Sequence, residues 1–483
     1  MKHYQKKVFL QVLIVTVFVF VWTVDAVFAG DAPSQGSIQV AVKKKPSNEQ
    51  WTLRDTRTIE MLAGFVPDQT SIELDTYGGR TDRQVESTGF FYPKKIDGRW
   101  WLVDPEGHLF IHTAIVSVYT GLTELGQKMT LDHFGSEEKW AQFSTDLLNQ
   151  YSFNGSGGWS QADLLRKTKN PPVYTISLDF IRDFAVTKDI AWQVSGHHGY
   201  PDKVWPVFHP DFETFCDTYA RKVEATKDDP YCLGYFSDNE LQMGDDILDR
   251  TLKLDLKKYP AMKYNAQEAK RWLSARKGKP AGLEDIDDQD RIDFIGHMFD
   301  RYFKLTTAAI RKYDPNHLCL GSRLHGYALR IPIVFQTAGK YIDVVSANYY
   351  NKWDPDPEQT AMWSRESGKP FIITEWYAKG MDSGLDNKSG AGWVVKTQSD
   401  RAKFYHNFAL GLMETKECVG WHWFKYQDNN PNDLSTDPSN RDSNKGVVTY
   451  DYKPYTTLLD GMKRLNDNVY SLIDYFDSKK TGL

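Results

Sequence analysis

The feature that most constrains the fold of this chain is a series of eight short apolar runs separated by amphipathic stretches. Each run is nearly continuous in apolar residues, which is typical of strands in a parallel sheet whose two faces are both covered. Between the runs, apolar residues such as Trp140, Phe143 and Leu147 recur at helical spacing. The eight runs are LFIHTAIVSV (109 to 118), YSFNGSGGW (151 to 159), VYTISLDF (173 to 180), YCLGYFSD (231 to 238), HLCLGSRL (317 to 324), YIDVVSANYY (341 to 350), FIITEW (371 to 376) and VGWHWFKY (419 to 426).

Eight strands alternating with helices predict an α/β protein with a closed (β/α)8 TIM barrel. The competing architecture is a doubly wound open sheet. That fold would need a glycine-rich phosphate turn after an early strand, and the sequence contains no G-x-G-x-x-G. The span from Leu241 to about Lys304 is too long for an ordinary connection, so we expect it to add helices above the barrel rim.

The N-terminus predicts a secretion signal over residues 1–29. Lys2, Lys6 and Lys7 precede a long apolar run, and Ala29 ends a small-residue cleavage pattern. We therefore expect a secreted or periplasmic protein with no stable membrane insertion after cleavage. An uncleaved anchor is the alternative, because the run is close to the lower limit for a spanning helix. Residues 30–88 are polar and without a strong period, so they predict a short N-terminal lead-in or cap, and residues 89–483 form the barrel.

Composition narrows the class of partner. The 483 residues carry a formal charge of −5, and Lys43, Lys44 and Lys45 form the only basic triplet, which is interpreted as a solvated flap. A nucleic-acid-binding protein would gather Lys and Arg on one strongly basic face, so no nucleic-acid partner is expected. Aromatic residues make up 14% of the chain, which suits a protein that stacks rings against flat ligands. Four cysteines in so long a chain do not indicate a disulfide scaffold.

Two glutamates end apolar strands of the predicted barrel. Active sites of such barrels form at the carboxyl ends of the strands. Strand four ends in Asn239 and Glu240, and strand seven ends in Glu375. A facing pair of carboxyl groups is what the cleavage of a glycosidic bond needs, with one protonating the leaving oxygen and the other attacking the anomeric carbon. We predict Glu240 as acid/base, with a pKa raised by burial and by the second carboxyl group, and Glu375 as nucleophile.

Other strand-end residues fit a sugar-binding cleft. The nucleophile must stay ionised, and Tyr350 and Arg323 end strands six and five, where each can donate a hydrogen bond to Glu375. Asn239 can contact the sugar 2-hydroxyl group, and Asn348 ends strand six beside the predicted site. Trp423 offers a flat apolar platform for a pyranose ring.

At these residues the chain resembles the clan A retaining glycoside hydrolases, and within that clan it is most similar to the family 50 β-agarases. The likeness covers about residues 89 to 460, in the right order. It implies a (β/α)8 barrel, a retaining double displacement by Glu240 and Glu375, and a β-linked glycan substrate of the agarose type. It rests on IDGRWWLVDPEGHLF (96 to 110), FNGSGGWS (153 to 160), VWPVFHPDF (204 to 212), GYFSDNE (234 to 240), YDPNHLCLGSRL (313 to 324), VVSANYY (344 to 350) and GWHWFKYQD (420 to 428).

Several segments depart from the family pattern. The stretch EWYAKGMDSG after the nucleophile differs from the expected E-F-H-F-G-like segment, and His112 stands where a Ser is expected on strand one. The loop at residues 428 to 446 is unlike that of the agarases, and the large carbohydrate-binding N-terminal module is reduced to a short lead-in. These changes leave the predicted fold and mechanism intact and bear on agarose specificity.

The remaining candidates carry two interpretations each. Trp159 is a sugar platform or ordinary core, and Trp376 closes the pocket wall or packs behind its strand. His325 and His112 lie near the predicted rim, where each binds sugar or has no such role. Asp238 is expected to form a structural ion pair, and His422 to be packed. His197 and His198 point apart in an extended chain and lack an H-E-x-x-H helix, so no metal is expected there.

The sequence thus predicts a secreted, cofactor-independent retaining hydrolase acting on a β-linked polysaccharide or oligosaccharide, with a β-galactose-containing glycan favoured. Retention requires the two carboxyl groups to lie about 5 to 5.5 Å apart, whereas inversion requires about 6.5 Å or more. Two alternatives stay open: a hydrolase of a different β-glycan with the same residues, and a glycan-binding barrel without catalysis. The sequence does not indicate the oligomeric state or exo versus endo cleavage.

Overall fold

The computed structural model describes residues 36–47, 50–69 and 71–479 of the chain. The predicted secretion signal and its cleavage site lie outside the described residues. Within the described ranges, no helix is both long enough and apolar enough to cross a bilayer. The four cysteines are all buried, and no disulfide joins them.

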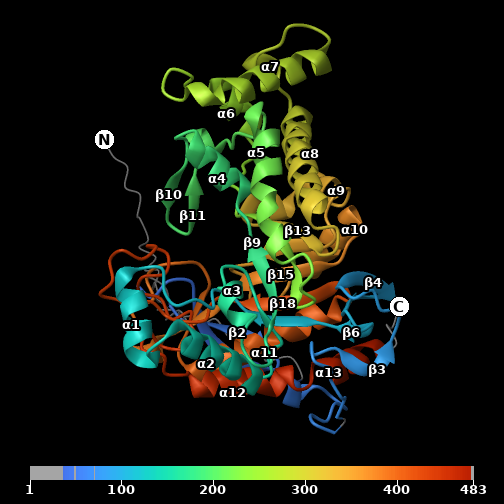
Figure 1. Cartoon of the computed structure of the whole chain (residues 1–483), viewed down its shortest axis with the longest axis vertical. Helices are drawn as coiled ribbons and strands as arrows, with labels where there is room; N and C mark the ends of the chain where they lie inside the picture. The colour runs from blue at the N-terminus through green and yellow to red at the C-terminus, as the bar shows by residue number, and fades with distance from the viewer. Residues whose placement is uncertain (1–35, 48–49, 70, 480–483) are drawn as a thin grey trace, which may run out of the picture.

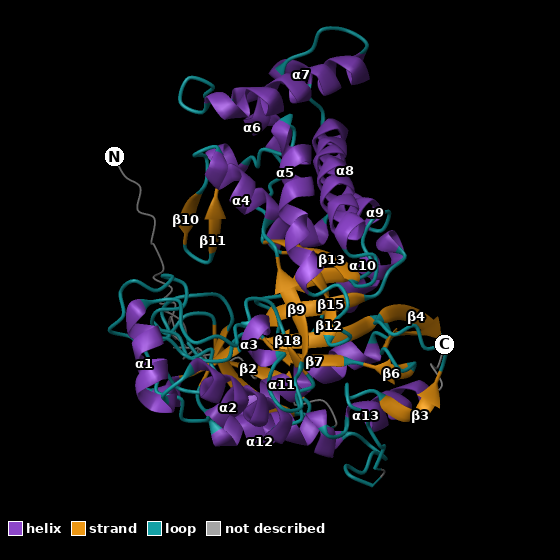
Figure 2. Cartoon of the chain, in the orientation of Figure 1, coloured by secondary structure: helices purple, strands orange, loops and turns teal. Residues whose placement is uncertain are grey.

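A closed barrel of eight parallel strands forms the centre of the molecule (Figure 2). Each predicted strand run overlaps one of these strands, so the TIM-barrel prediction is confirmed and the open sheet is excluded. The strands follow the order β12-β13-β14-β15-β18-β7-β8-β9 around the barrel. They are β7 (His112–Ile115), β8 (Gly155–Ser156), β9 (Val173–Ser177), β12 (Cys232–Asn239), β13 (Leu318–Leu324), β14 (Val345–Asn348), β15 (Phe371–Trp376) and β18 (Cys418–Trp423).

Helices connect and cover the strands, and their ends follow from local sequence. In α10, the Asp356 side chain accepts a hydrogen bond from the Gln359 N–H, Pro357 occupies the first turn, and Gly368 ends the helix in the left-handed region. The α-helices are α1 (Glu124–Phe134), α2 (Glu137–Gln150), α3 (Ala162–Leu165), α4 (Phe180–Thr187), α5 (Asp211–Tyr219), α6 (Ile247–Lys253), α7 (Lys263–Lys277), α8 (Asp288–Tyr313), α9 (Pro332–Ala338), α10 (Pro357–Ser367), α11 (Gln398–Glu414), α12 (Thr456–Asn466) and α13 (Val469–Ser478).

The long segment after β12 forms a helical projection, as predicted. Helices α6 and α7 lie at the far end of the molecule, beyond the start of α8 (Figure 1). Helix α8 has 26 residues and is therefore about 39 Å long, whereas a typical strand spans about 17–20 Å. Its first turns consequently extend past the barrel rim. A reciprocal capping box between Asp287 and Asp290 fixes the start of α8.

The predicted N-terminal lead-in contributes strands to two sheets outside the barrel. In one, β1 pairs with β2 and with β17, and β17 pairs with β16; in the other the order is β3-β6-β5-β4. A further hairpin, β10–β11, follows α4. These strands are β1 (Ile38–Lys43), β2 (Thr52–Thr56), β3 (Arg80–Gln84), β4 (Tyr92–Ile96), β5 (Arg99–Val103), β6 (His108–Phe110), β10 (Trp192–Val194), β11 (His197–Gly199), β16 (Ala378–Gly380) and β17 (Trp393–Val395).

The β3-β6-β5-β4 sheet closes the amino-terminal end of the barrel. One buried apolar cluster joins this sheet to the barrel. It contains Tyr77, Phe91 and Phe110 from the region of the sheet, and Val173 and Ile372 from the starts of barrel strands. The opposite end, where the strands terminate, is thereby the open one. The first barrel strand is β7, so the strands between Gly89 and Phe110 belong to this closing sheet.

Candidate active site

A cavity of about 1170 Å³ lies over the carboxyl ends of the barrel strands. Side chains at or after the carboxyl ends of all eight strands line it, together with Lys445 from the segment after β18. Both predicted catalytic glutamates face this cavity. The lining includes Ser117, Tyr119, Trp159, Asp179, Arg182, Asn239, Glu240, His325, Tyr350, Asn351, Glu375, Tyr377, Phe424 and Lys445. The strand-end rule therefore locates the site from sequence.

Glu375 is held by two donors on neighbouring strands. It is a buried residue of β15, and one carboxylate oxygen accepts a hydrogen bond from Nη2 of the fully buried Arg323. The other oxygen accepts a hydrogen bond from the Tyr350 hydroxyl group. Arg323 also donates to the carbonyl oxygen of Thr374 at 3.1 Å, which fixes the guanidinium in place. These two donors fix the orientation of the Glu375 carboxyl group.

Glu240 has a different environment. Its Oε1 accepts a hydrogen bond from Asn348 Nδ2 at 2.9 Å, and its Oε2 lies 3.8 Å from His325 Nδ1. Burial raises the pKa of Glu240; His325 opposes this shift, and the charge on Glu375 adds to it. The two carboxyl groups thus differ in their partners: Arg323 and Tyr350 donate to Glu375, whereas burial raises the pKa of Glu240.

Asn348 supports Glu240 and does not line the cavity. It is fully buried, and Nδ2 donates both to Glu240 and, at 3.1 Å, to Asn239 Oδ1. Its own Oδ1 accepts a hydrogen bond from Thr374 Oγ1 at 2.8 Å. With its amide committed to protein partners, Asn348 positions Glu240 and Asn239. The prediction that it contacts substrate is corrected accordingly.

Three other predicted site residues lie outside the cavity lining. Trp423 is fully buried, its Nε1 donates to the Lys445 carbonyl oxygen at 3.0 Å, and it packs on Trp376, which is 1% exposed. Both rings face the helix layer around α11 instead of a sugar. His112 is buried, with Nδ1 2.9 Å from His422 Nε2. The sugar-platform role predicted for Trp423 is therefore corrected. Of the two interpretations given for Trp376 and for His112, packing behind the strand and the absence of a sugar contact agree with this burial, and His422 is packed as expected.

Of the remaining predicted residues, all but the fully buried Arg323 line the cavity. Trp159 is partly exposed there, with the Arg323 guanidinium 5.5 Å from its ring centre. His325 and Asn239 also border the cavity beside Glu240. Phe424, one residue beyond Trp423, supplies the aromatic surface that was expected of Trp423.

Asp238 does not form the expected ion pair. Its carboxylate accepts hydrogen bonds from the Ile181 N–H at 2.9 Å and from the Tyr302 hydroxyl group at 2.9 Å. The first contact lies in the opening turn of α4, where exposed N–H groups favour a negative charge. Burial, and after it Asp179, raises the pKa of Asp238. This side chain therefore joins α4 to β12 beneath the cavity.

Left-handed backbone is concentrated along the cavity wall. Five lining residues that are not glycine have positive φ angles, between 46° and 66°. Such conformations are unfavourable for residues with a Cβ atom, and they collect at functional sites where surrounding structure holds them. Glu240 itself has φ 46°, so the turn after β12 aims its carboxyl group across the barrel mouth. The five residues are Ser117, Trp159, Asp179, Glu240 and Asn351.

Several lining residues were not predicted. Burial raises the pKa of Asp179 to about 6, and Tyr377 has its pKa raised by burial and by the charge on Glu375. Asp179 follows strand three, so the strand-end rule already contained its signal. Lys445 reaches the cavity from the 428–446 loop, and Lys45 reaches it from the segment that follows β1. No local pattern marks these two lysines, because only the tertiary pairing of β1 with β17 brings Lys45 there.

Replacing Tyr350 by phenylalanine is expected to lower kcat/KM about 10- to 100-fold on any cleaved glycan. The change removes the hydroxyl donor to Glu375, and a hydrogen bond to a charged group contributes about 1.5–3 kcal/mol. Steady-state kinetics measures the effect. Tyr349→Phe is the matched control, because its hydroxyl group bonds to Gln359 at 2.9 Å and not to Glu375. Equal losses in both variants would contradict a specific role for Tyr350.

The chain is similar to two curated proteins. No protein-family model matches the chain. Among curated proteins, β-agarase B of Vibrio sp. (strain JT0107) is 26% identical over 493 residues, which cover 82% of this chain and 50% of the relative. β-Agarase A of the same strain is 24% identical, covering 82% and 48%. The chain therefore spans about half the length of the curated relatives it matches.

Solved structures include one similar over nearly the whole chain. The crystal structure of BpGH50 is 31% identical, with a TM-score of 0.79, covering 92% of this chain and 96% of that one. A structure of an exo-β-agarase is 20% identical with a TM-score of 0.66, covering 84% and 68%, and supports the fold alone.

Proposed function

Because the chain belongs to glycoside hydrolase family 50, we propose that it cleaves β-glycosidic bonds with Glu240 as acid/base and Glu375 as nucleophile. The observation that carries this proposal is the pairing of two carboxyl groups with opposite environments in one cavity. Arg323 and Tyr350 donate to Glu375, whereas burial raises the pKa of Glu240. The helices, loops and N-terminal sheets around the barrel serve to hold this pair.

The proposed reaction is a double displacement with retention. In the first step Glu375 attacks the anomeric carbon, the glycosidic C–O bond breaks, and the Glu240 proton passes to the leaving oxygen. In the second step Glu240, now ionised, takes a proton from water, which attacks the anomeric carbon and releases Glu375. Asn239, held by Asn348, is placed to contact the sugar 2-hydroxyl group. The separation of about 5 to 5.5 Å between the carboxyl groups stays a prediction.

The proposed substrate is an agarose-like or other β-galactose-containing glycan. The curated relatives are β-agarases, which favours this class. The cavity volume of about 1170 Å³ exceeds the range of about 300–1,000 Å³ for small-molecule sites, as a site for an oligosaccharide requires.

The cavity wall also supports the second candidate, a different β-glycan cleaved by the same residues. Part of the wall comes from the 428–446 loop, which departs from the agarase pattern. Its Asp437 accepts hydrogen bonds from Gln193 Nε2 at 3.0 Å and from the Gly196 N–H at 3.2 Å. The loop and the β10–β11 hairpin therefore meet beside the cavity and can set which glycan enters. The expected secretion of the chain would give it access to such polysaccharides outside the cell.

Incubating the wild-type chain with a panel of β-glycans, agarose and its oligosaccharides included, tests the function. We expect reducing-end products from one β-galactose-containing glycan and not from a chemically unrelated one. Release only from another β-glycan would favour the second candidate. Binding without release from any member would support a glycan-binding barrel and overturn the hydrolase proposal. Chromatography of the products over time measures the release.

A further inference from the structure

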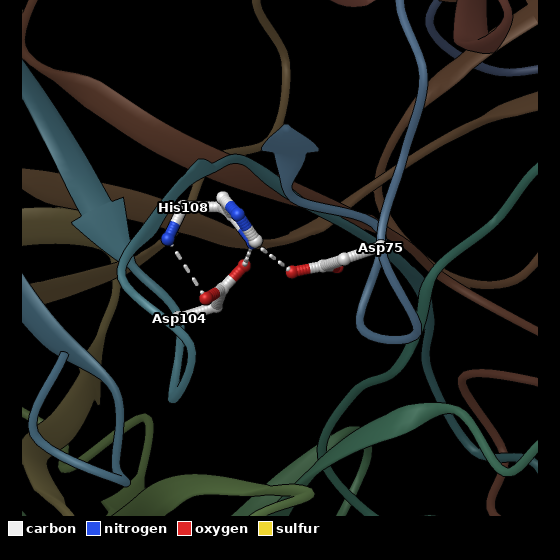
Figure 3. Close-up of side chains that lie close together, drawn as sticks. All are labelled: Asp75, Asp104 and His108. Carbon is white, nitrogen blue, oxygen red and sulfur yellow. Dashed lines mark hydrogen bonds and ion pairs between the residues drawn. The ribbon is translucent and has the colours of Figure 1, made fainter. Parts of the chain in front are cut away.

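Two loops meet at the closed end of the molecule, away from the glutamate pair. Asp75 lies in the loop before β3, Asp104 lies in the turn that joins β5 to β6, and His108 is the first residue of β6. Figure 3 shows the three side chains pointing toward one another. A Cβ atom at Gly79 would lie 2.0 Å from Asp104 Oδ2, so a glycine is required for the loops to approach this closely.

Backbone groups fix the direction of both carboxylates. Asp75 Oδ1 accepts hydrogen bonds from the N–H groups of Tyr77, Gly78 and Gly79 at 2.9, 2.9 and 2.8 Å. Asp104 Oδ1 accepts from the N–H groups of residues 106 and 108 at 2.9 Å each. The other oxygen of each carboxylate, Oδ2, makes none of these bonds and faces His108. Such fixed ligands are what a preorganised ion site needs.

The three inward atoms have spacings that suit a bound ion. Asp75 Oδ2 lies 2.7 Å from His108 Nδ1, and Asp104 Oδ2 lies 3.9 Å from the same nitrogen. All three atoms lie within 4.8 Å of one another. Oxygen and nitrogen ligands bind zinc at about 2.0–2.2 Å, so two such ligands in a tetrahedral site lie about 3.3–3.6 Å apart. To reach this spacing, the Asp75–His108 pair must move apart by about 0.6 Å or more, and the Asp104–His108 pair must approach by about 0.3–0.6 Å.

One carboxylate oxygen of the cluster has no hydrogen-bond donor. Asp104 is fully buried, and its Oδ2 has no hydrogen-bond partner among the described residues. Arg80 is committed to Asp82 and Asp474, each at 2.7 Å. A buried carboxylate oxygen without a donor, aimed at a second carboxylate and an imidazole, is suited to bind a cation.

We infer that Asp75, Asp104 and His108 form a structural site for a divalent metal ion, with zinc the best match. Two carboxylates and a neutral imidazole offset the charge of such an ion. Imidazole favours zinc over calcium and magnesium, which prefer sets made only of oxygen. A water molecule would complete a tetrahedron. The ion would join the Asp75 loop to the β5–β6 turn and so hold Tyr77 in the cluster that closes the barrel.

Zinc binding to the chelator-treated full chain tests the site. We expect one zinc ion per chain by elemental analysis and a saturable rise in Tm of several degrees, with no rise from calcium or magnesium. Asp104→Asn and His108→Gln should each abolish the rise. Asp97→Asn is the matched control, because Asp97 lies in the neighbouring β4–β5 turn with 83% of its side chain exposed. Absence of uptake by the wild type, or equal uptake by Asp104→Asn, would overturn the inference.

The direction in which Asp104→Asn changes Tm distinguishes two roles for Asp104: binding an ion, or only accepting the hydrogen bonds of the turn. Asparagine keeps the Oδ1 acceptor for the turn and removes the crowding of two carboxyl groups. With chelator present, the variant should therefore be at least as stable as the wild type. With zinc present, the wild type should have the higher Tm. A variant less stable than the wild type by the same margin in both conditions would mean that Asp104 acts only through the turn.

Discussion

Replacing Glu375 by glutamine is expected to lower kcat on the cleaved glycan on the order of 10⁴- to 10⁶-fold, as the loss of a nucleophile does. Glutamine keeps the shape and hydrogen-bonding atoms of the side chain but does not attack the anomeric carbon. Glu268→Gln is the matched control, because Glu268 pairs with Arg271 and His297 on the helical projection, away from the cavity. A rate within tenfold of the wild type would show that Glu375 is not the nucleophile.

A smaller residue at the same position gives a sharper test. In Glu375→Gly, azide has room to attack the anomeric carbon of an activated aryl glycoside, while the aryl alcohol leaves. The product should be the α-glycosyl azide, because only one displacement takes place. Circular dichroism checks that the variant folds, since the change leaves the buried Arg323 without its carboxylate partner. A β-glycosyl azide from this variant would assign Glu375 a different role.

Replacing Glu240 by alanine is expected to lower the rate on the natural glycan by about 10²- to 10⁴-fold, the usual contribution of a general acid. An aryl glycoside whose leaving group needs no proton should still form the glycosyl-enzyme. Azide should then restore turnover and give the β-glycosyl azide, because Glu375 remains. Product analysis by NMR distinguishes this result from that of Glu375→Gly. Failure of azide to restore any turnover would contradict the acid/base role.

The pH profile carries a second signature of Glu240. The acid must be protonated for the first step, and burial raises its pKa above the usual carboxyl value of 4.5. The wild-type kcat/KM should therefore fall as the pH rises through this raised pKa. In Glu240→Ala with the activated substrate, that alkaline limb should disappear. A limb that persists unchanged would belong to a group other than Glu240 and would contradict this assignment.

The barrel was predictable because its strands are buried on both faces. Continuous apolar runs of strand length stand out against helical stretches, and polar residues at their ends mark the mouth of the barrel. Because these runs are apolar on both faces of the strand, the sequence does not indicate which side chains point into the barrel and which point toward the helices. Trp421 and Trp423 alternate with His422, as expected, yet the tryptophans face the helices and His422 faces His112 inside the barrel. Apolar character on both faces gave no signal to choose between these arrangements.

Local sequence patterns do not predict contacts between distant segments of the chain. Strand β1, in the lead-in predicted over residues 30–88, pairs with β17, which lies more than 350 positions later in the chain. This pairing brings Lys45 to the cavity. The segment that contains Asp104 and His108 contributed to the family likeness, but its proximity to Asp75 follows only from the closing sheet. Asn348 was placed at the right strand end. Its side-chain amide forms hydrogen bonds with Glu240, Asn239 and Thr374, and these contacts are evident only in the folded structure.

The measurement that tests the central claim most directly is the anomeric configuration of the first product, followed by ¹H NMR as wild-type enzyme cleaves its glycan. The account predicts that the β-anomer appears first and that the α-anomer follows by slow mutarotation, because two displacements at one carbon restore its configuration. Initial release of the α-anomer would mean a single displacement by water. Glu375 would then be a base and not a nucleophile, and the proposed mechanism would be wrong.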